Sequence, residues 1–465
     1  MNAGFLIFFL HTARAEEARV VQGVLSRITS LNPFTIGNIE AFEVTGNVIE
    51  PLTRVDPFTK ALKPWLAKLT AQDVKHSFEM HGKPYVLWPD IVGSRVLDAH
   101  TIEFTAKSLN YETLRNILTM LRIVPKQDLK TVAHDELTGT GPFKVARFEP
   151  GRRLELEPFK AWWGGRESAA NFKLVVKNVA DTLAAEQMFQ KNELDFFQLP
   201  ADYAKSDGPA TPLTLATGQG IWIDLNLSRP IFRDPRVRQA LIQLWDLESG
   251  NQKIFAGRWE LAIDTFSPAT SYYPPGSPLA FNTTKANETF VELGWLDRDK
   301  DGVREKSIDG KLEKFSFTLL LNSQAGERWA TLFKADAAKL GVEVKLKRVD
   351  DPARWWQIVR SSQYDALASG GPVQDEVYEA SWGSKGQYNS AKFKNPEVDR
   401  LIAKLQKEYD GDRRANLFRQ IIQIIRAEYP QLTGLFSRQR FFLISARLKV
   451  DPESPSQPWK WRLKN

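Results

Sequence analysis

Two stretches of the chain alternate between strand and helix patterns, and this alternation constrains the fold more than any other feature. In the first stretch, residues 172–179 are rich in β-formers, residues 180–190 carry apolar side chains three and four positions apart, and residues 194–197 return to a strand pattern. The second stretch, residues 315–368, repeats the alternation. We therefore predict an α/β fold with open, largely parallel sheets and helices on both faces.

The second stretch also indicates where its elements end. We place the end of its first helix at Gly341, because glycine adopts the left-handed conformation that stops a helix. Open sheets of this kind bind ligands at the carboxyl ends of their strands, so we expect a ligand site after the last strand. The predicted strands are 315–321, 342–346 and 364–368, and the predicted helices are 326–340 and 353–361.

Two residue pairs that end in proline mark further helix starts. Asp234 and Asn395 can cap free backbone N–H groups, and the proline that follows each of them loses nothing by lacking an N–H. Arg236 and Arg238 are predicted on the polar side of the first helix, where we assign them to salt bridges of the scaffold. Another amphipathic helix is predicted over residues 413–428.

Length and composition exclude several classes of protein. The chain has 465 residues, more than one hydrophobic core can organise, so two or more lobes are expected. It contains no Cys, which excludes disulfides, thiolate metal sites and cysteine nucleophiles. The 63 basic residues are interleaved with 56 acidic ones, so we interpret the net charge of +7 as a solvated surface and predict no nucleic-acid binding.

The N-terminal segment carries a targeting pattern. Residues 1–15 join a short apolar run to an Ala-Arg-Ala ending of the kind that a secretory peptidase cleaves. We predict a signal peptide and hence an exported, soluble, periplasmic protein; the alternative is a buried N-terminal strand or helix. No Cys follows the apolar run, so we expect no lipid anchor on cysteine.

Short motifs follow one another along most of the chain. They are Ser30–Pro33, Val48–Leu52, Leu69–Phe78, Gly139–Phe143, Ala161–Gly164, Leu225–Leu227 and Phe232–Leu241. In this order they resemble the oligopeptide-binding family of ABC-importer solute receptors, solute-binding protein family 5. Within that family, Gly371–Glu376 and Ser381–Ser384 look most like the branch that takes up murein peptides and peptide-nucleotide microcins.

The resemblance implies a two-lobed, periplasmic-binding-protein-like fold (class II, peptide-binding type) with a hinge and a small insert domain. After Ala67 the family normally has a β-hairpin that this chain lacks, so we expect a reduced insert. The predicted parts are a signal peptide at 1–15, a discontinuous lobe I at 16–41, 139–220 and 438–465, a shortened insert at 42–138, and lobe II at 221–437.

The resemblance also implies a function. It indicates an extracytoplasmic receptor, not an enzyme, that captures a peptide or muropeptide between its lobes and delivers it to an ABC permease in the inner membrane. Ligand would bridge both lobes and shift the population to a closed form that the permease recognises. We expect a monomer that needs no cofactor.

A zwitterionic peptide requires an acid for its ammonium group and polar or aromatic contacts elsewhere. Asp375 and Glu376 follow the predicted strand 364–368, so we predict that one of them binds the amine; solvated loop acids are the alternative. Trp222 and Trp382 are predicted to stack on the ligand, with core packing as the alternative.

Other predicted ligand contacts are polar side chains. Asn226 follows an apolar strand and is predicted to bond the ligand backbone, although an Asn in such a place more often fixes a local turn. The remaining predicted ligand-binding residues are Gln374, Tyr388, Asn389, Glu50 and Asn32.

One acidic segment has the spacing of a calcium loop. Asp297, Asp299 and Asp301 precede Gly302 in a 1-3-5-6 pattern, but Ile308 stands at the twelfth position, where such a loop requires a bidentate Glu. We therefore favour an Asp/Gly-rich turn over a metal site.

Three rival functions stay open. An exported hydrolase acting on cell-wall fragments has no specific support, because the chain contains no G-x-S-x-G or H-E-x-x-H motif. The same fold also accommodates a non-peptide solute, such as nickel, a sugar or an opine. A chaperone-like or sensory domain that binds exposed peptide segments is the third.

Overall fold

The computed structural model describes most of the chain. The predicted signal peptide and three predicted ligand-binding residues, Gln374, Asp375 and Glu376, lie outside the described residues. The described residues are 18–34, 39–55, 62–64, 69–81, 91–107, 111–126, 137–165, 170–200, 210–264, 266, 273–322, 324–349, 351–372, 381–386, 388–452, 455 and 457–464.

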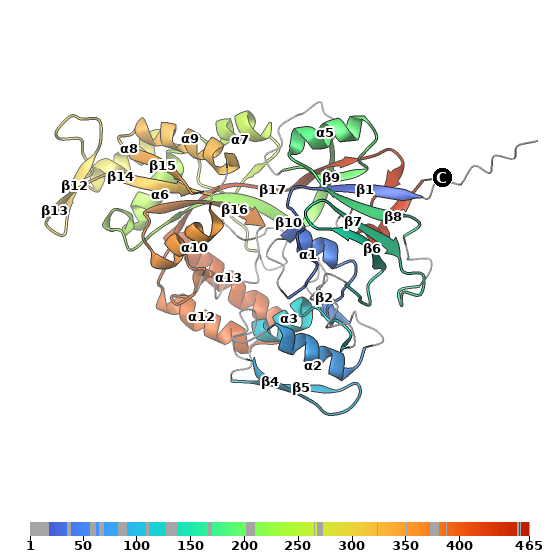
Figure 1. The fold of residues 1–465 in the computed structure, drawn as a ribbon. Helices are drawn as coiled ribbons and strands as arrows, with labels where there is room; N and C mark the ends of the chain where they lie inside the picture. The colour runs from blue at the N-terminus through green and yellow to red at the C-terminus, as the bar shows by residue number, and fades with distance from the viewer. Residues whose placement is uncertain are drawn as a thin grey trace, which may run out of the picture.

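An eleven-stranded sheet extends through both lobes of the molecule (Figure 1). From the lobe II edge to the lobe I edge its strands are β15 (Glu343–Arg348), β14 (Ser316–Leu321), β16 (Ala366–Pro372), β10 (Ala210–Leu225), β17 (Gln431–Ile444), β9 (Phe196–Gln198), β1 (Arg19–Val24), β8 (Lys173–Asn178), β7 (Arg153–Pro158) and β6 (Phe143–Glu149), with β11 (Glu260–Leu261) paired to β17.

The sheet is mixed, so the expectation of largely parallel sheets is wrong. Strand β14 is parallel to β15 and β16, and β1 is parallel to β8 and β9, as the two β-α-β stretches predict. Strand β10, however, is antiparallel to both β16 and β17, and β17 is antiparallel to β9. These pairs are antiparallel because β10 and β17 cross between the lobes in opposite directions, whereas β7 is antiparallel to β6 and β8 within lobe I.

Lobe I packs helices on both faces of its part of the sheet. Alternate residues of β1 point to opposite faces, since the side-chain period of a strand is two. Val20 and Val24 join the core that includes helix α1 (Ile39–Thr45), whereas Val21 joins the core that includes helix α5 (Thr182–Gln190).

Lobe II follows the same rule. Phe317 and Leu319 of β14 pack in a core with four helices on one face, whereas Leu320 packs with α10 on the other face.

The described helices include no segment long and apolar enough to cross a membrane. The helices of lobe II are α6 (Pro235–Gln243), α7 (Leu247–Phe255), α8 (Thr283–Glu292), α9 (Gln324–Ala338), α10 (Pro352–Ser361), α12 (Pro396–Lys407) and α13 (Gly411–Glu428).

A small unit with its own core lies beside lobe I (Figure 1). Phe78, Leu121 and Ile123 are nearly inaccessible to solvent at its centre. Its elements are β2 (Thr53–Val55), β3 (Leu62–Pro64), α2 (Ala71–Met80), β4 (Ile91–Val96), β5 (Ile102–Ala106) and α3 (Tyr111–Met120). The other described elements are the hairpin of β12 (Glu305–Ile308) and β13 (Lys311–Lys314), the pair β18 (Leu448–Lys449) and β19 (Arg462–Leu463), and 3-10 turns at Pro230–Phe232 and Pro458–Lys460.

Both predicted proline-marked helix starts are confirmed. The carboxylate of Asp234 accepts a hydrogen bond from the Arg236 N–H at 2.9 Å, and the Asn395 amide oxygen accepts one from the Glu397 N–H at 3.0 Å. Each cap satisfies a backbone donor that the first helical turn leaves without an intrahelical partner.

Arg238 does not lie on a polar helix face, so that placement is wrong, but the predicted scaffold salt bridge is present, with Glu428 at 3.5 Å. Its side chain is buried, and its guanidinium donates to the carbonyl oxygens of Phe232 at 2.6 Å and of Tyr429 at 3.0 Å, among others. Burial lowers the pKa of Arg238 to about 10. Arg238 therefore ties the start of α6 to the end of α13 by bonding carbonyls that the chain leaves free at both places.

The motif Gly139–Phe143 holds lobe I against the segment that leads into the small unit. Gly141 and Phe143 donate their N–H groups to the carbonyls of Val48 and Asn47, at 2.9 and 3.1 Å. The backbones approach so closely that a Cβ atom on Gly139 would overlap the Val48 carbonyl oxygen. The two glycines are thus required by packing.

We predict that Gly139→Ala lowers the free energy of unfolding by about 1–3 kcal/mol or more, because an added methyl group forces the two backbones apart. Urea unfolding of the purified protein measures this change. Gly93→Ala is the matched control: a Cβ there meets nothing within 4 Å, so its change should stay within about 0.5 kcal/mol. Equal effects of the two substitutions would contradict the packing role.

Candidate functional site

The lobe II half of β10 carries a buried carboxylate on one face. Ile221 and Ile223 point into the lobe II core, so Trp222 and Asp224 share the opposite face. Asp224 is 2% exposed and accepts a hydrogen bond from the Ser369 hydroxyl at 2.6 Å. Burial raises the pKa of the Asp224 carboxyl, while hydrogen bonds from neighbours that include Ser369 and Trp222 oppose this shift.

A segment that contains three predicted ligand-binding residues lies beside this face. The Tyr364 hydroxyl donates to the Ser390 carbonyl, and burial raises the pKa of that phenol. Asn389 is buried, and its amide donates to the carbonyls of Gly383 and Phe393 at 2.9 and 2.7 Å. The Asn389 side chain therefore holds the loop that carries it.

Trp382 and Tyr388 differ in exposure. Trp382 is buried and stacks on Phe266, with ring centroids 5.9 Å apart, in the core of α12 and α13. Tyr388 is 44% exposed and lies 6.3 Å from the Trp356 ring. The third predicted aromatic contact, Trp222, is half-buried on β10. Tyr388 and Trp222 thus keep surface that a ligand can reach, whereas Trp382 is occupied by core contacts.

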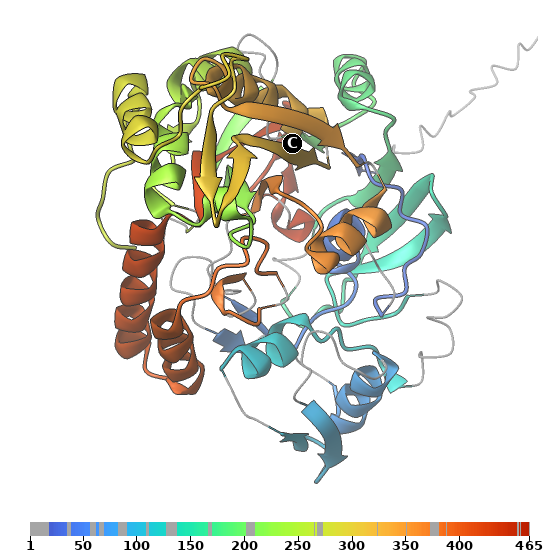
Figure 2. The same cartoon turned by 90° about the vertical axis from the view of Figure 1, so that its left-hand side faces the viewer.

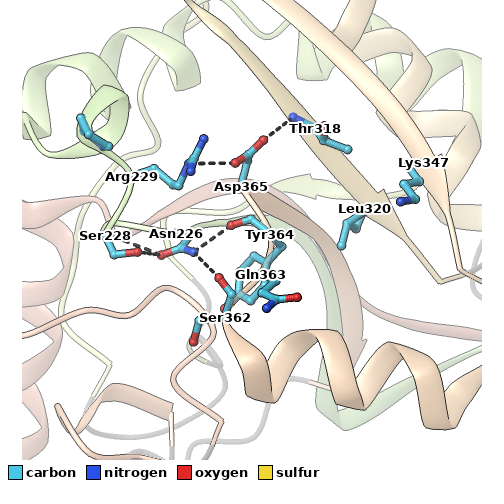
Figure 3. Close-up of a pocket in the computed structure, with 11 residues that line it drawn as sticks. Asn226, Ser228, Arg229, Thr318, Leu320, Lys347, Ser362, Gln363, Tyr364 and Asp365 are labelled. Carbon is cyan, nitrogen blue, oxygen red and sulfur yellow. Dashed lines mark hydrogen bonds and ion pairs between the residues drawn. The ribbon is translucent and has the colours of Figure 1, made fainter. Parts of the chain in front are cut away.

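A cavity of about 490 Å³ opens beside the end of β10 (Figure 3). Asn226 lines it and donates to the carbonyls of Ser362 and Tyr364, at 3.3 and 2.8 Å. Asp365 pairs with Arg229 at 2.9 Å. The cavity lies at the amino end of β16, opposite the strand ends where a ligand is expected. Its lining residues are Asn226, Ser228, Arg229, Pro230, Thr318, Leu320, Lys347, Ser362, Gln363, Tyr364 and Asp365.

Two predicted residues belong to lobe I and its neighbour unit. Glu50 is fully buried, and its carboxylate accepts hydrogen bonds from the Thr140 hydroxyl at 2.9 Å and the Trp163 ring N–H at 2.8 Å. The Asn32 amide oxygen accepts from the Phe34 N–H at 3.0 Å and so closes a local turn. Both polar groups therefore bind protein atoms in this structure.

The crossing strands carry a second set of polar groups, which the sequence interpretation missed. Arg440 of β17 is largely buried, and burial lowers its pKa to about 10, although the nearby Glu43 carboxylate opposes that shift. Burial raises the pKa of Glu43 in turn. Among the described residues, the Nε of Arg440 has no hydrogen-bond partner.

Gln219 stands at the point where β10 passes from one lobe to the other. It is paired with Ser437 of β17 on one side and with Pro372 of β16 on the other. Its side-chain oxygen is buried and has no hydrogen-bond partner within the described ranges. In the sequence, Pro372 directly precedes the segment that carries the predicted amine-binding acids.

The structure therefore brings some predicted residues together and separates others. Trp222, Asn226, Trp382, Tyr388 and Asn389 all belong to lobe II, on or beside β10 and the loop before α12. The missed residues had one usable signal: Arg440 directly precedes the apolar run Phe441–Ile444 of β17, where burial of a charge is costly unless another group offsets it.

A family model matches residues 67–390, more than half of the chain: Bacterial extracellular solute-binding proteins, family 5 Middle. The chain belongs to this family of solute-binding proteins. Among curated relatives, the oligopeptide-binding protein AppA of Bacillus subtilis is 28% identical over 402 residues, which cover 78% of this chain and 71% of AppA. A putative binding protein of Brucella abortus is 27% identical over 327 residues, but the match spans only 52% of that protein.

Solved structures share the two-lobed fold, which confirms the predicted fold class. AppA of Bacillus subtilis with a nonapeptide superposes with a TM-score of 0.76 at 23% identity and covers 96% of this chain and 99% of AppA. NikA of Brucella suis with Fe(III)-EDTA gives 0.82 at 18% identity, covering 96% and 100%. The unliganded open form of MppA, a periplasmic murein tripeptide binding protein, gives 0.73 at 17% identity, covering 97% and 98%.

The effect of burial on Asp224 can be tested through the pH dependence of the free energy of unfolding. Because its folded pKa is raised, the folded state holds a proton more strongly than the unfolded chain does. Lowering the pH from about 7 to about 4 should therefore increase the stability of the wild type relative to Asp224→Asn, as measured by urea unfolding at each pH.

Asp234 provides the control of opposite sign. Its hydrogen bond and ion pair with Arg236 lower its pKa, so the wild type should lose stability relative to Asp234→Asn as the pH falls through about 4 and below. If both variants shift in the same direction, the burial of the Asp224 carboxylate is not what sets its titration.

Proposed function

We propose that the protein captures a peptide or peptide-like solute between its two lobes and delivers it to an ABC permease of the inner membrane. The observation that carries the proposal is Arg440, a largely buried guanidinium on a strand that joins the lobes, with an Nε that lacks a protein partner among the described residues. A buried charge of this kind is costly unless another group pairs with it. A ligand carboxylate has the charge and geometry to do so.

The rest of the peptide extends from this anchor. We assign the ligand's amine to Asp375 or Glu376, whose segment starts after Pro372, opposite Gln219. The Gln219 side-chain oxygen can accept a backbone N–H of the ligand. Trp222 and Tyr388 supply aromatic surface in lobe II for its side chains. An anion site and a cation site on different segments suit a zwitterionic ligand better than a neutral sugar.

Contacts of lobe II with lobe I and with the small unit support capture by closure. The Arg258 guanidinium at the end of α7 lies 4.2 Å from the Phe441 ring centroid of β17, within lobe I. The Arg414 guanidinium of α13 lies 3.6 Å from the Tyr111 ring centroid of α3. A ligand that contacts both lobes adds to these contacts only when the lobes approach, and so shifts the population toward the closed form.

The ligand class within the family is a further part of the proposal. We assign a murein-derived peptide on the basis of the segment Gly371–Glu376 and the following Trp382 motif. Fold likeness does not select this class by itself, because NikA with Fe(III)-EDTA superposes with a higher TM-score than MppA. We further propose that the protein works in the periplasm as a monomer and catalyses no reaction.

Arg440→Leu tests the anchor. We predict that it weakens peptide binding by roughly tenfold or more, because a charge-assisted hydrogen bond is lost. The free energy of unfolding should change little, because removal of a costly buried charge offsets the lost attraction to the Glu43 carboxylate. Calorimetric titration with a murein tripeptide and with a nonapeptide measures affinity, after native mass spectrometry has identified any co-purified ligand. Arg236→Leu is the control, since Arg236 is exposed and pairs only locally with Asp234.

The outcomes separate binding from scaffolding. Loss of stability together with loss of affinity would make Arg440 a structural residue. Unchanged affinity in a folded Arg440→Leu variant would remove the anchor from the proposal. Turnover of the murein tripeptide by the wild type would contradict the assignment as a receptor without catalysis.

A further inference from the structure

The loop from Asp297 to Glu305 lies at the far end of lobe II, between α8 and the β12–β13 hairpin (Figure 1), and faces the viewer in Figure 2. The Asp297 carboxylate accepts the Gly302 N–H at 3.1 Å, and Asp301 accepts the Val303 N–H at 2.9 Å. Gly302 has a φ of +88°, a conformation that favours glycine. The loop therefore curls so that its acidic side chains converge.

A buried glutamate points into this loop. Glu305 is 2% exposed, and one of its carboxylate oxygens accepts the Arg298 N–H at 2.7 Å. Its second oxygen, Oε2, is buried and has no hydrogen-bond partner in the described part of the chain. Asp297, Asp299 and Glu305 each place one carboxylate oxygen within 4.8 Å of the others. An unpartnered buried carboxylate oxygen requires a cation or a donor to offset its desolvation.

We propose that Asp297, Asp299 and Glu305 bind a calcium ion. Calcium takes oxygen ligands at about 2.3–2.6 Å, so two ligands of one ion lie no more than about 5 Å apart, and all three carboxylates meet this condition. Asp301 and the Val303 carbonyl stand at the fifth and seventh loop positions, which supply further oxygen ligands in calcium loops. Glu305, at the ninth position, provides the buried acid that Ile308 cannot provide at the twelfth.

Lys314 would compete with a bound calcium ion for acidic side chains of the loop. Its ammonium group on β13 forms ion pairs with Asp299, at 3.1 Å, and with Asp301. Both of these acids are about half exposed, whereas Glu305 is buried and its Oε1 forms an ion pair with the Arg298 guanidinium, at 3.9 Å. Lys314 therefore neutralises the outer side of the loop, and the Oε2 of Glu305 is the oxygen that has no hydrogen-bond partner among the described residues.

The position of the loop indicates what the ion would do. Glu305 exchanges backbone hydrogen bonds with Leu296, at 2.8 and 3.2 Å. The neighbouring Arg304 guanidinium donates to the Trp295 and Leu340 carbonyls, at 2.8 and 2.6 Å. An ion here would join the end of α8 to the base of the hairpin and to the turn before β15. Its effect is on the stability of lobe II, because the loop lies far from the crossing strands (Figure 1).

Thermal unfolding of the purified protein in EGTA, and then in calcium chloride or magnesium chloride up to about 5 mM, tests the site. We expect the melting temperature to rise with calcium, with an apparent dissociation constant of roughly 10⁻⁴–10⁻³ M, the range of extracellular modules, and to respond little to magnesium. Asp299→Asn and Glu305→Gln should each weaken the calcium response by at least about tenfold. Asp309→Asn, in the neighbouring hairpin turn, should leave it unchanged.

Lys314→Gln separates the two interpretations of the loop. If calcium binds, removal of the competing ammonium should tighten calcium binding, since the outer acids lose their internal cation. If the loop is only a salt-bridged turn, Lys314→Gln lowers the melting temperature and confers no calcium response. No calcium-dependent heat or melting shift in the wild type, an equal shift with magnesium, or a shift that survives both Asp299→Asn and Glu305→Gln would overturn the proposal.

Discussion

The antiparallel pair β10–β17 is the constraint on which the rest of the molecule depends, because these two strands join both lobes in one sheet. Their backbones approach more closely than side chains permit: a Cβ on Gly434 would lie 2.5 Å from the Ile221 carbonyl oxygen, and one on Gly218 would overlap the Phe436 ring. The ladder shifts register between Thr214 and Gln219 and again after Gly220. Such irregularities bend and twist a strand locally. The lobes are thus held together laterally by one ladder that is irregular where it crosses between them.

Strands β10 and β17 also determine which polar side chains could contact a ligand. Strand alternation sends Ile221 and Ile223 into the lobe II core and leaves Trp222 and Asp224 on the other face. In lobe I, alternation on β17 places Arg440 on the face that α1 covers, beside Glu43. A solute held near the crossing therefore meets groups from both lobes without a long loop.

Much of the architecture was accessible from the sequence, and the exceptions share one cause. The β-α-β stretch over residues 315–368 was predicted because each element has its own period, and the cap at Asp234 was predicted because it acts within one turn. The antiparallel crossing and the burial of Arg238 were not, since both depend on segments far apart in the chain. Arg238 donates hydrogen bonds to the carbonyls of residues 232–233 and 428–429. No residue near α6 in the sequence indicates that the carbonyls of residues 428–429 lie beside Arg238. Placement of the candidate ligand residues has the same limit: motif position identified the loop around Asn389, but only the fold shows that its amide holds that loop.

The buried charges of this protein differ in how far the described residues satisfy their hydrogen-bonding atoms. Asp224 and Arg238 are desolvated, yet protein groups surround them with donors or acceptors, so folding alone accounts for them. Arg440 and Glu305 are also desolvated, but each keeps one polar atom that no described residue satisfies. Leaving such an atom unpaired costs free energy in the folded state, typically about 1–3 kcal/mol and more for a charged group. The two proposed partners from outside the chain, an anionic group of the solute at Arg440 and a cation at Glu305, would each satisfy one such atom.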